Sequence, residues 1–371
     1  MSRESPGAFP LFDLLARQWR LPAPATGLYF NANSSAVAAP LHDGRVALVA
    51  VADGEPPESR IALDEAGRRT ITPRRAEPQP ALVLAAHGDR PARIAAGPGE
   101  SFLVARGREL ARMTAQGTEG AMAPSLGGAV LALDHGHASG MTVIAAQNAV
   151  EIRDSQGGAV QGGADWGAQA ATISPDGAWI AFGCGDSLSL TRRETPFEIV
   201  RRYQCPGRIE RISWRADAAF LVAICGKGGL ALLDVGGDRF GAIADFPVAP
   251  RSAAFSVAAN ALVTSGAFRI AAWDLARPPF GADRSGALET GRTGLVPVVE
   301  VAVHPTRKLV AAAYTSGQLV IAEIGGRDEL ILQAAGLEPR ALLWSGDGRT
   351  LGLSAGEGLS LVSLPEAMFK S

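Results

Sequence analysis

The sequence predicts an all-β protein whose short antiparallel strands repeat around a closed ring, a β-propeller. The first observation is a repeated apolar pair: eight times an apolar residue stands just before a turn, and in seven of these repeats another follows seven positions later. The second is the period, because from Ile173 onward the first members are 41, 41, 48 and 41 residues apart. Repeats of about 40–45 residues with several strands each are typical of propeller blades.

The paired positions mark one turn in every repeat. Their first members are Phe30, Ala96, Leu133, Ile173, Trp214, Phe255, Val303 and Trp344. Their partners are Val37, Leu103, Ile180, Leu221, Leu262, Val310 and Leu351, while Gly140 takes this place in the third repeat. Eight marked turns favour eight blades of about 43 residues, and seven blades of roughly 50 residues are the alternative.

Residues 170–202 show how one repeat divides into four strands. Residues 171–173 predict a short inner strand, and the sequence SPDG that follows predicts its turn, because proline presets the turn and glycine accepts a positive φ. Residues 179–182 predict a second strand that is apolar on both faces because neighbouring blades cover it. A third strand is indicated by the alternation at residues 188–191, and a half-exposed outer strand by residues 197–202.

The two ends of the chain are expected to complete the ring together. The final repeat ends after its third strand, so residues 18–21, within an N-terminal segment of residues 1–24, are expected to pair with it as the missing outer strand. The propeller is expected to span residues 25–365. Residues 53–80, rich in proline and arginine, predict a surface insertion, and residues 276–298 predict a second long loop. Such loops either carry function or are tolerated variation in length.

Several repeats resemble WD repeats. The turns ISPDG, ending at Gly177, and WSGDG, ending at Gly348, match that family's turn between the first and second strands. Trp273-Asp274 is a literal Trp-Asp pair at the end of a third strand, and Asp154 and Asp234 stand at similar places. The family's Gly-His dipeptide is missing from most repeats. The resemblance covers residues 25–365 and implies a ring of four-stranded antiparallel blades.

Composition argues against several classes of function. A formal net charge of −2 predicts no general affinity for nucleic acid or for an anionic membrane. The sequence has no run of about 18 apolar residues, so it predicts no membrane-spanning helix. The first residues lack the apolar centre of a secretory signal, and three cysteines are few for an exported protein. We therefore expect a cytoplasmic protein, a monomer by itself, with reduced thiols at Cys184, Cys205 and Cys225.

The sequence contains no strong catalytic motif. The GxSxG elbow, the Walker loop and the dinucleotide fingerprint are all missing, so we expect no catalytic residue and no cofactor. His135 and His137 are weak candidates for zinc ligands, because further ligands would have to converge from other blades; a polar loop is the alternative. Two other functions stay open: a propeller hydrolase or lactonase with a divalent metal in the central channel, and a metal-trafficking or sensing protein.

A binding rim is the site that the resemblance favours. In WD-repeat propellers one rim is built from the turns between second and third strands and from the loops that enter each inner strand. The turns hold Asp43, Arg106, Asn148, Asp186, Lys227, Tyr314 and Glu357, and the entering loops hold Arg90, Arg208, Arg251 and Arg340. Arginine and tyrosine are favoured where interfaces concentrate their binding energy. We therefore expect a non-catalytic scaffold that presents this rim and the central channel to a protein partner.

Overall fold

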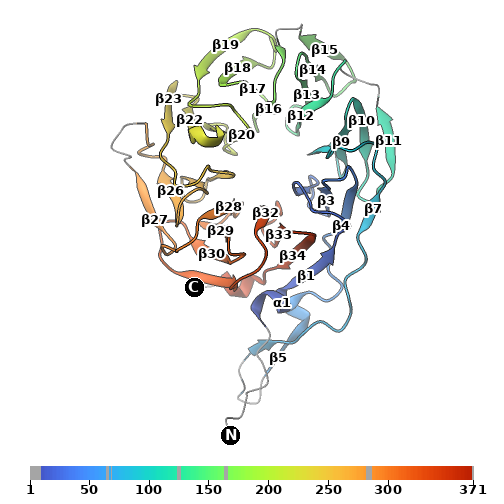
Figure 1. Ribbon diagram of the computed structural model, residues 1–371, viewed down its shortest axis with the longest axis vertical. Helices are drawn as coiled ribbons and strands as arrows, with labels where there is room; N and C mark the ends of the chain where they lie inside the picture. Colours follow the sequence, from blue (N-terminus) through green and yellow to red (C-terminus); the bar gives the residue numbers. More distant parts are fainter. Residues whose placement is uncertain are drawn as a thin grey trace.

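The computed structural model describes residues 10–63, 67, 69–122, 127–162, 166–280 and 286–369. Within these residues, eight four-stranded antiparallel sheets stand around a central opening as the blades of a propeller (Figure 1). The predicted all-β propeller is confirmed, and the eight-blade prediction is correct where the seven-blade alternative is not. No helix in the described part of the chain is long and apolar enough to cross a membrane.

The blades follow one another along the chain, each with its innermost strand first. Blade 1 holds β2 (Tyr29–Phe30), β3 (Ala36–Pro40), β4 (Val46–Ala50) and β7 (Leu82–Leu84). Blade 2 holds β8 (Arg93–Ala96), β9 (Phe102–Arg106), β10 (Glu109–Met113) and β11 (Glu119–Met122). Blade 3 holds β12 (Val130–Gly136), β13 (Met141–Ala146), β14 (Val150–Arg153) and β15 (Ala159–Gly162). Blade 4 holds β16 (Ala170–Ile173), β17 (Trp179–Cys184), β18 (Ser187–Arg192) and β19 (Ile199–Gln204).

The second half of the ring repeats this order. Blade 5 holds β20 (Arg211–Trp214), β21 (Phe220–Ile224), β22 (Leu230–Asp234) and β23 (Arg239–Ile243). Blade 6 holds β24 (Ala253–Ser256), β25 (Ala261–Thr264), β26 (Ile270–Asp274) and β27 (Ala287–Thr290). Blade 7 holds β28 (Val298–Val303), β29 (Leu309–Tyr314), β30 (Leu319–Glu323) and β31 (Glu329–Gln333). Blade 8 holds β32 (Pro339–Trp344), β33 (Thr350–Ala355), β34 (Gly358–Ser363) and, from the other end of the chain, β1 (Ala16–Arg20).

The seven-residue spacing of the apolar pairs comes from the first hairpin of each blade. In six blades the two positions lie directly opposite each other, as in Phe30–Val37, Ile173–Ile180, Trp214–Leu221, Phe255–Leu262, Val303–Val310 and Trp344–Leu351. The third repeat departs from the spacing because β12 continues to Gly136, which sets Leu133 opposite Ile144 instead. The sequence signal is therefore the register of one recurring hairpin.

The two WD-like turns have the same internal hydrogen bonds. The Ser174 hydroxyl donates to Asp176 and accepts from the backbone N–H of Trp179 (2.9 Å). In the last blade the Ser345 hydroxyl likewise donates to Asp347 (2.6 Å). Gly177 and Gly348 follow at φ +71° and +70°, a conformation that favours glycine. These residues determine the turn locally, which is why the sequence alone could identify it.

The apolar core lies between blades rather than within them. Eight apolar clusters are present among the described residues, and each joins two neighbouring blades, so that every junction around the ring has one. The junction of blade 8 with blade 1, where Leu359 and Leu361 pack with Val37 and Val49, is among them. Each blade is therefore stabilised by its neighbours, as in other repeat architectures.

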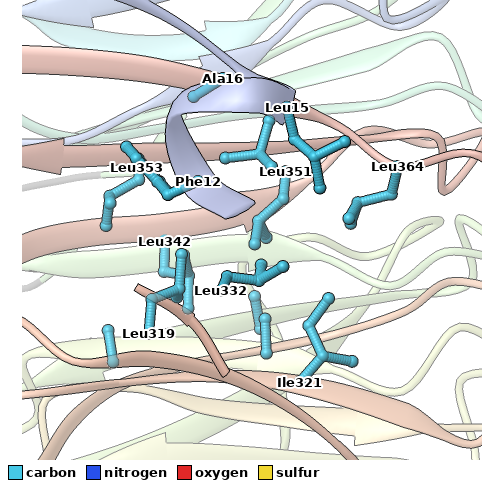
Figure 2. Close-up of a cluster of buried hydrophobic side chains, with 14 of the residues drawn as sticks. Phe12, Leu15, Ala16, Leu319, Ile321, Leu332, Leu342, Leu351, Leu353 and Leu364 are labelled. Carbon is cyan, nitrogen blue, oxygen red and sulfur yellow. The ribbon is translucent and has the colours of Figure 1, made fainter. Parts of the chain in front are cut away.

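The N-terminal strand closes the ring as predicted. Strand β1 pairs antiparallel with β34, with Trp19 opposite Leu359. The short helix α1 (Leu11–Leu15) precedes it and buries Phe12 and Leu15 in the cluster between blades 7 and 8 (Figure 2). Residues 1–9 of the predicted N-terminal segment lie outside the described residues.

The insertion at residues 53–80 fastens this closing strand to the first blade. It contains a turn of 3-10 helix, η1 (Pro57–Arg60), and a separate pair of strands, β5 (Ile61–Leu63) and β6 (Arg69–Ile71). Arg60 donates to the carbonyl of Leu14 (2.6 Å), and the Trp19 indole donates to the carbonyl of Gln79 (2.6 Å). Within the two long loops, residues 64–66, 68 and 281–285 lie outside the described residues.

Candidate binding rim and central channel

The loops that enter blades 5, 7 and 8 are each hydrogen-bonded at the predicted rim to the blade before them. The backbone N–H of Ile209 donates to Gly185 O (2.8 Å), that of Gly294 to Phe268 O (2.7 Å), and that of Gly336 to Ser316 O (3.0 Å). In each pair the donor lies in an entering loop and the acceptor lies in a turn between second and third strands. At these three junctions the rim is therefore held in place before any partner binds.

The predicted rim residues differ in how they are exposed. Seven have exposed side chains on this rim: Arg90, Asn148, Asp186, Arg208, Lys227, Arg340 and Glu357. Asp43 and Arg251 are half-buried and Arg106 and Tyr314 are buried. Four of the set are held in ion pairs within the chain: Asp43 with Arg45 (2.5 Å), Arg106 with Glu119 (2.6 Å), Glu357 with Arg20 (3.3 Å), and Arg251 with Glu338 (2.9 Å).

Arg106 and Tyr314 are not available to a partner. Each is the last residue of a second strand, β9 or β29, rather than part of the turn that follows. The Arg106 guanidinium donates to both carboxylate oxygens of Glu119 (2.9 and 2.6 Å). Tyr314 packs in the cluster between blades 6 and 7, and this burial raises the pKa of its hydroxyl to about 12. We therefore leave both residues out of the proposed binding surface.

The central channel has a cavity of about 450 Å³ at the end that the entering loops surround. It is lined by the beginnings of the inner strands of seven blades, all except blade 6. Arg93, Arg211 and Arg340 supply its basic side chains, and Asp134, Glu210 and Glu300 supply its acidic ones. Of these six, only Arg340 was predicted. The sequence could have indicated three of the others as channel residues, because Arg93, Arg211 and Glu300 each stand three positions before the first member of an apolar pair.

Glu300 is a buried acid in the wall of this channel. Glu300 is 6% exposed. It lies on β28, where the pairing with β29 shifts register between Val298 and Glu300. Arg251 lies 3.4 Å from its carboxylate. Burial raises the pKa of Glu300 to about 7, because loss of hydration disfavours the charged form more than Arg251, Arg211 and a hydrogen bond with Ser252 favour it.

This acid predicts a pH dependence that the variant Glu300→Gln should remove. The folded-state pKa of about 7 lies above the ordinary value of 4.5, so the folded protein binds more protons between these pH values. The contribution of Glu300 to stability is therefore full below about pH 4.5 and falls by about 3 kcal/mol as the pH rises to 7. In denaturant unfolding, the free energy of the variant minus that of the wild type should increase by about this amount between pH 5 and pH 8. A constant difference would contradict the assignment.

The weak metal candidates have internal partners. His135 is buried, its Nδ1 lies 3.0 Å from the hydroxyl of Thr142, and its ring packs edge-on against His137 at a centroid distance of 5.0 Å. Burial lowers the pKa of His135. Cys205 and Cys225 are buried between blades 4 and 5. No group of three or more His, Cys, Asp or Glu side chains suited to a metal ion occurs in the described ranges.

The comparisons with known proteins identify the fold. No family model matches the sequence, and no curated protein is similar to it in sequence. The structure is similar to the C-terminal WD40 domain of Sif2, with a TM-score of 0.64 and 12% identity over 95% of this chain and 99% of that one. It is also similar to the WD40 domain of Pan2 from Neurospora crassa, with a TM-score of 0.55 and 12% identity over 92% and 90% of the two chains. The eight-bladed ring, its WD-like turns and these similarities together show that the chain has the fold of a WD-repeat β-propeller.

Proposed function

We propose that the protein is a non-catalytic scaffold that binds a protein partner on the rim formed by its entering loops. The observation that carries this proposal is a set of exposed apolar side chains on one part of that rim. These are Val248 (39% exposed), Phe268 (41%), Leu295 (97%) and Leu337 (66%), which we call the apolar arc. Exposed apolar groups gathered on one surface are typical of sites where proteins associate.

The four members of the apolar arc lie on loops that contact one another. The backbone N–H of Val248 donates to Gly266 O (3.1 Å), close to Phe268, and that of Gly294 donates to Phe268 O (2.7 Å). On the loop entering blade 6, the Arg251 guanidinium lies 2.9 Å from the carboxylate of Glu338, the residue that follows Leu337. The arc therefore extends across blades 6, 7 and 8, with charged groups at its edge, as in the core and border of a protein interface.

The scaffold would act by rigid presentation. Because the loops entering blades 7 and 8 are already hydrogen-bonded to the blades before them, the partner would meet an ordered surface there, and little conformational entropy would be lost on binding. Arg208 lies on the same rim, on the loop entering blade 5. Its side chain is exposed and has no partner in the part of the chain that the structure describes, so it is available to bind the partner protein. We also propose that the free protein is cytoplasmic and monomeric. Its molar mass in solution, measured by light scattering, tests the monomeric state.

Placing charges in the apolar arc should abolish partner binding without unfolding the protein. We expect the amount of partner recovered from native cells with the double variant Leu295→Asp, Leu337→Asp to be at least about tenfold lower than with the wild type. The reason is that central apolar contacts dominate the binding energy of interfaces. Arg208→Ala should weaken recovery by a smaller factor. Quantitative mass spectrometry of affinity-purified complexes measures both, and thermal melting checks the fold.

Val160→Asp is the matched control. Val160 is 55% exposed on the outer strand β15, away from the rim, so this variant should recover the partner as the wild type does. Equal recovery by the rim variant would overturn the proposal. A divalent metal found in stoichiometric amount in the purified protein, lost together with a hydrolytic activity, would favour the hydrolase alternative instead.

A further inference from the structure

Two cysteines from successive blades meet beneath the rim. Cys205 follows β19 of blade 4 and Cys225 follows β21 of blade 5, and both are buried in the apolar cluster between these blades, 5% and 2% exposed. Their thiols are in hydrogen-bond contact with each other. The third cysteine, Cys184, is exposed. The buried two are therefore the pair that is placed to react together.

The backbone beside the two thiols shows the same proximity. The loop that follows Cys205 packs directly on the turn that begins at Cys225. A Cβ atom added to Gly207 would lie 2.8 Å from Cys225 O. One added to Gly228 would lie 2.5 Å from Pro206 O. Because neither glycine leaves room for a side chain, the loop and the turn are fixed against each other, and the thiols lie on facing segments.

We infer that Cys205 and Cys225 form a redox-sensitive pair, which a hydroperoxide converts to a disulfide between the loop entering blade 5 and the turn between β21 and β22. Both segments belong to the rim, where they carry the exposed side chains of Arg208 and Lys227. A disulfide holds its sulfur atoms about 2.05 Å apart, closer than two thiols in a hydrogen bond, so its formation would draw the segments together. Oxidation would therefore alter the rim at this junction, and reduction would restore it.

Cys225 is the thiol that reacts first. A hydrogen bond from the Cys205 thiol lowers the pKa of Cys225, although burial acts to raise it. The backbone N–H groups of Ala231 and Gly207 also lower this pKa. The hydrogen bond between the thiols, together with burial, raises the pKa of Cys205. Since the thiolate is the nucleophile, Cys225 supplies the attacking sulfur, and Cys205 keeps its proton for the second step.

The oxidation balances in two steps. The Cys225 thiolate attacks one oxygen of the hydroperoxide, the O–O bond breaks, and the other oxygen takes up a proton and leaves as an alcohol or water, so that Cys225 becomes a sulfenic acid. The Cys205 sulfur then attacks this sulfur, an S–S bond forms, and the hydroxyl group leaves with the Cys205 proton as water. The two thiols lose two electrons, which reduce the peroxide. Pro206 and Lys227 beside the pair are exposed, so a small peroxide has only a short distance to travel.

Peptide mapping of the folded full-length protein tests the inference. After hydrogen peroxide treatment and alkylation of the remaining thiols, trypsin should release residues 203–208 and 216–227 as one linked species, lighter by two hydrogen atoms than the two reduced peptides together. Dithiothreitol should separate them. Hydrogen exchange at residues 205–209 and 225–229 should slow in the oxidised protein, because the bond ties these segments together.

Three variants and a bulky reagent serve as controls. Cys184→Ser should form the linkage as the wild type does, whereas Cys205→Ala and Cys225→Ala should each abolish it and keep the wild-type circular dichroism spectrum. Before oxidation, N-ethylmaleimide should label Cys184 in the folded protein and leave the buried pair unlabelled, because only the exposed thiol admits a reagent of this size.

Three results would count against the inference. One is a pair that stays reduced under conditions in which peroxide oxidises Cys184. Another is a main disulfide that joins Cys184 to either buried cysteine. The third is linkage without any change in hydrogen exchange at the two segments, which would mean that the bond does not alter the rim. The proposed function is judged separately, since recovery of the partner by the apolar arc variants is measured on the reduced protein and does not depend on this bond.

Discussion

Replacement of Trp344 by alanine is expected to lower the free energy of unfolding by about 3–5 kcal/mol, because it removes a large buried side chain from a junction between blades. Trp344 is 6% exposed and packs in the cluster between blades 7 and 8. Its indole N–H donates to Ala302 O (3.1 Å), and its ring lies edge-on to His304 at a centroid distance of 4.9 Å. Guanidinium-induced unfolding, monitored by circular dichroism, measures the loss.

Trp214→Ala provides the comparison, since Trp214 is the corresponding residue of blade 5. Both tryptophans are first members of the repeated apolar pair, but Trp214 is only half-buried, and its indole N–H has no partner within the described residues. We expect Trp214→Ala to cost about 1–2 kcal/mol. An equal loss for the two variants would contradict the view that complete burial between blades determines the contribution of each tryptophan.

The second large effect is expected for Asp53→Asn at the closure of the ring. The Asp53 carboxylate accepts hydrogen bonds from the two terminal nitrogens of Arg74 (2.8 and 2.5 Å), and Arg17 lies 3.8 Å away; the three side chains are 6–13% exposed. Removing the negative charge would leave two arginines buried without their counter-ion, which typically costs about 3–5 kcal/mol. Because Arg17 belongs to β1, the closing strand should be the first part of the propeller to open, which hydrogen exchange detects.

Glu357→Gln is the matched control for this prediction. It removes a carboxylate that also pairs with an arginine of β1, Arg20 at 3.3 Å, but these side chains are 48% and 88% exposed. An exposed pair of this kind contributes about 1 kcal/mol or less. If Asp53→Asn were as mild as Glu357→Gln, the buried cluster would not be what fastens the closing strand.

The pH dependence of Asp53 has a definite sign. Burial acts to raise its pKa, but hydrogen bonds from Arg74 and from the backbone of Glu55, with the charges of Arg17 and Arg74, outweigh burial and lower the pKa below its usual 3.8. A lowered pKa means that Asp53 stabilises the folded protein fully above the unfolded-state value and loses this contribution as the pH falls through the folded-state value. Acid unfolding should therefore begin at a higher pH in Asp53→Asn than in the wild type.

The features that the sequence could predict are those set by residues close together in the chain. The seven-residue spacing is the register of one hairpin, and Ser174 and Asp176 determine their turn through contacts within a few residues. The same regularity showed that the last blade lacked an outer strand, which pointed to the N-terminal segment as its source.

What the tertiary structure alone decided is where side chains go once the blades pack together. Arg106 and Tyr314 occupy positions next to rim turns in the sequence, yet both are buried. Arg93, Arg211 and Arg340 are far apart in the chain and share one cavity only because their blades stand around the same axis. Exposure and charge at this rim therefore depend on contacts between distant segments. The sequence by itself determined the repeating unit and its closure, whereas the binding surface emerged only from the packing of one blade against another.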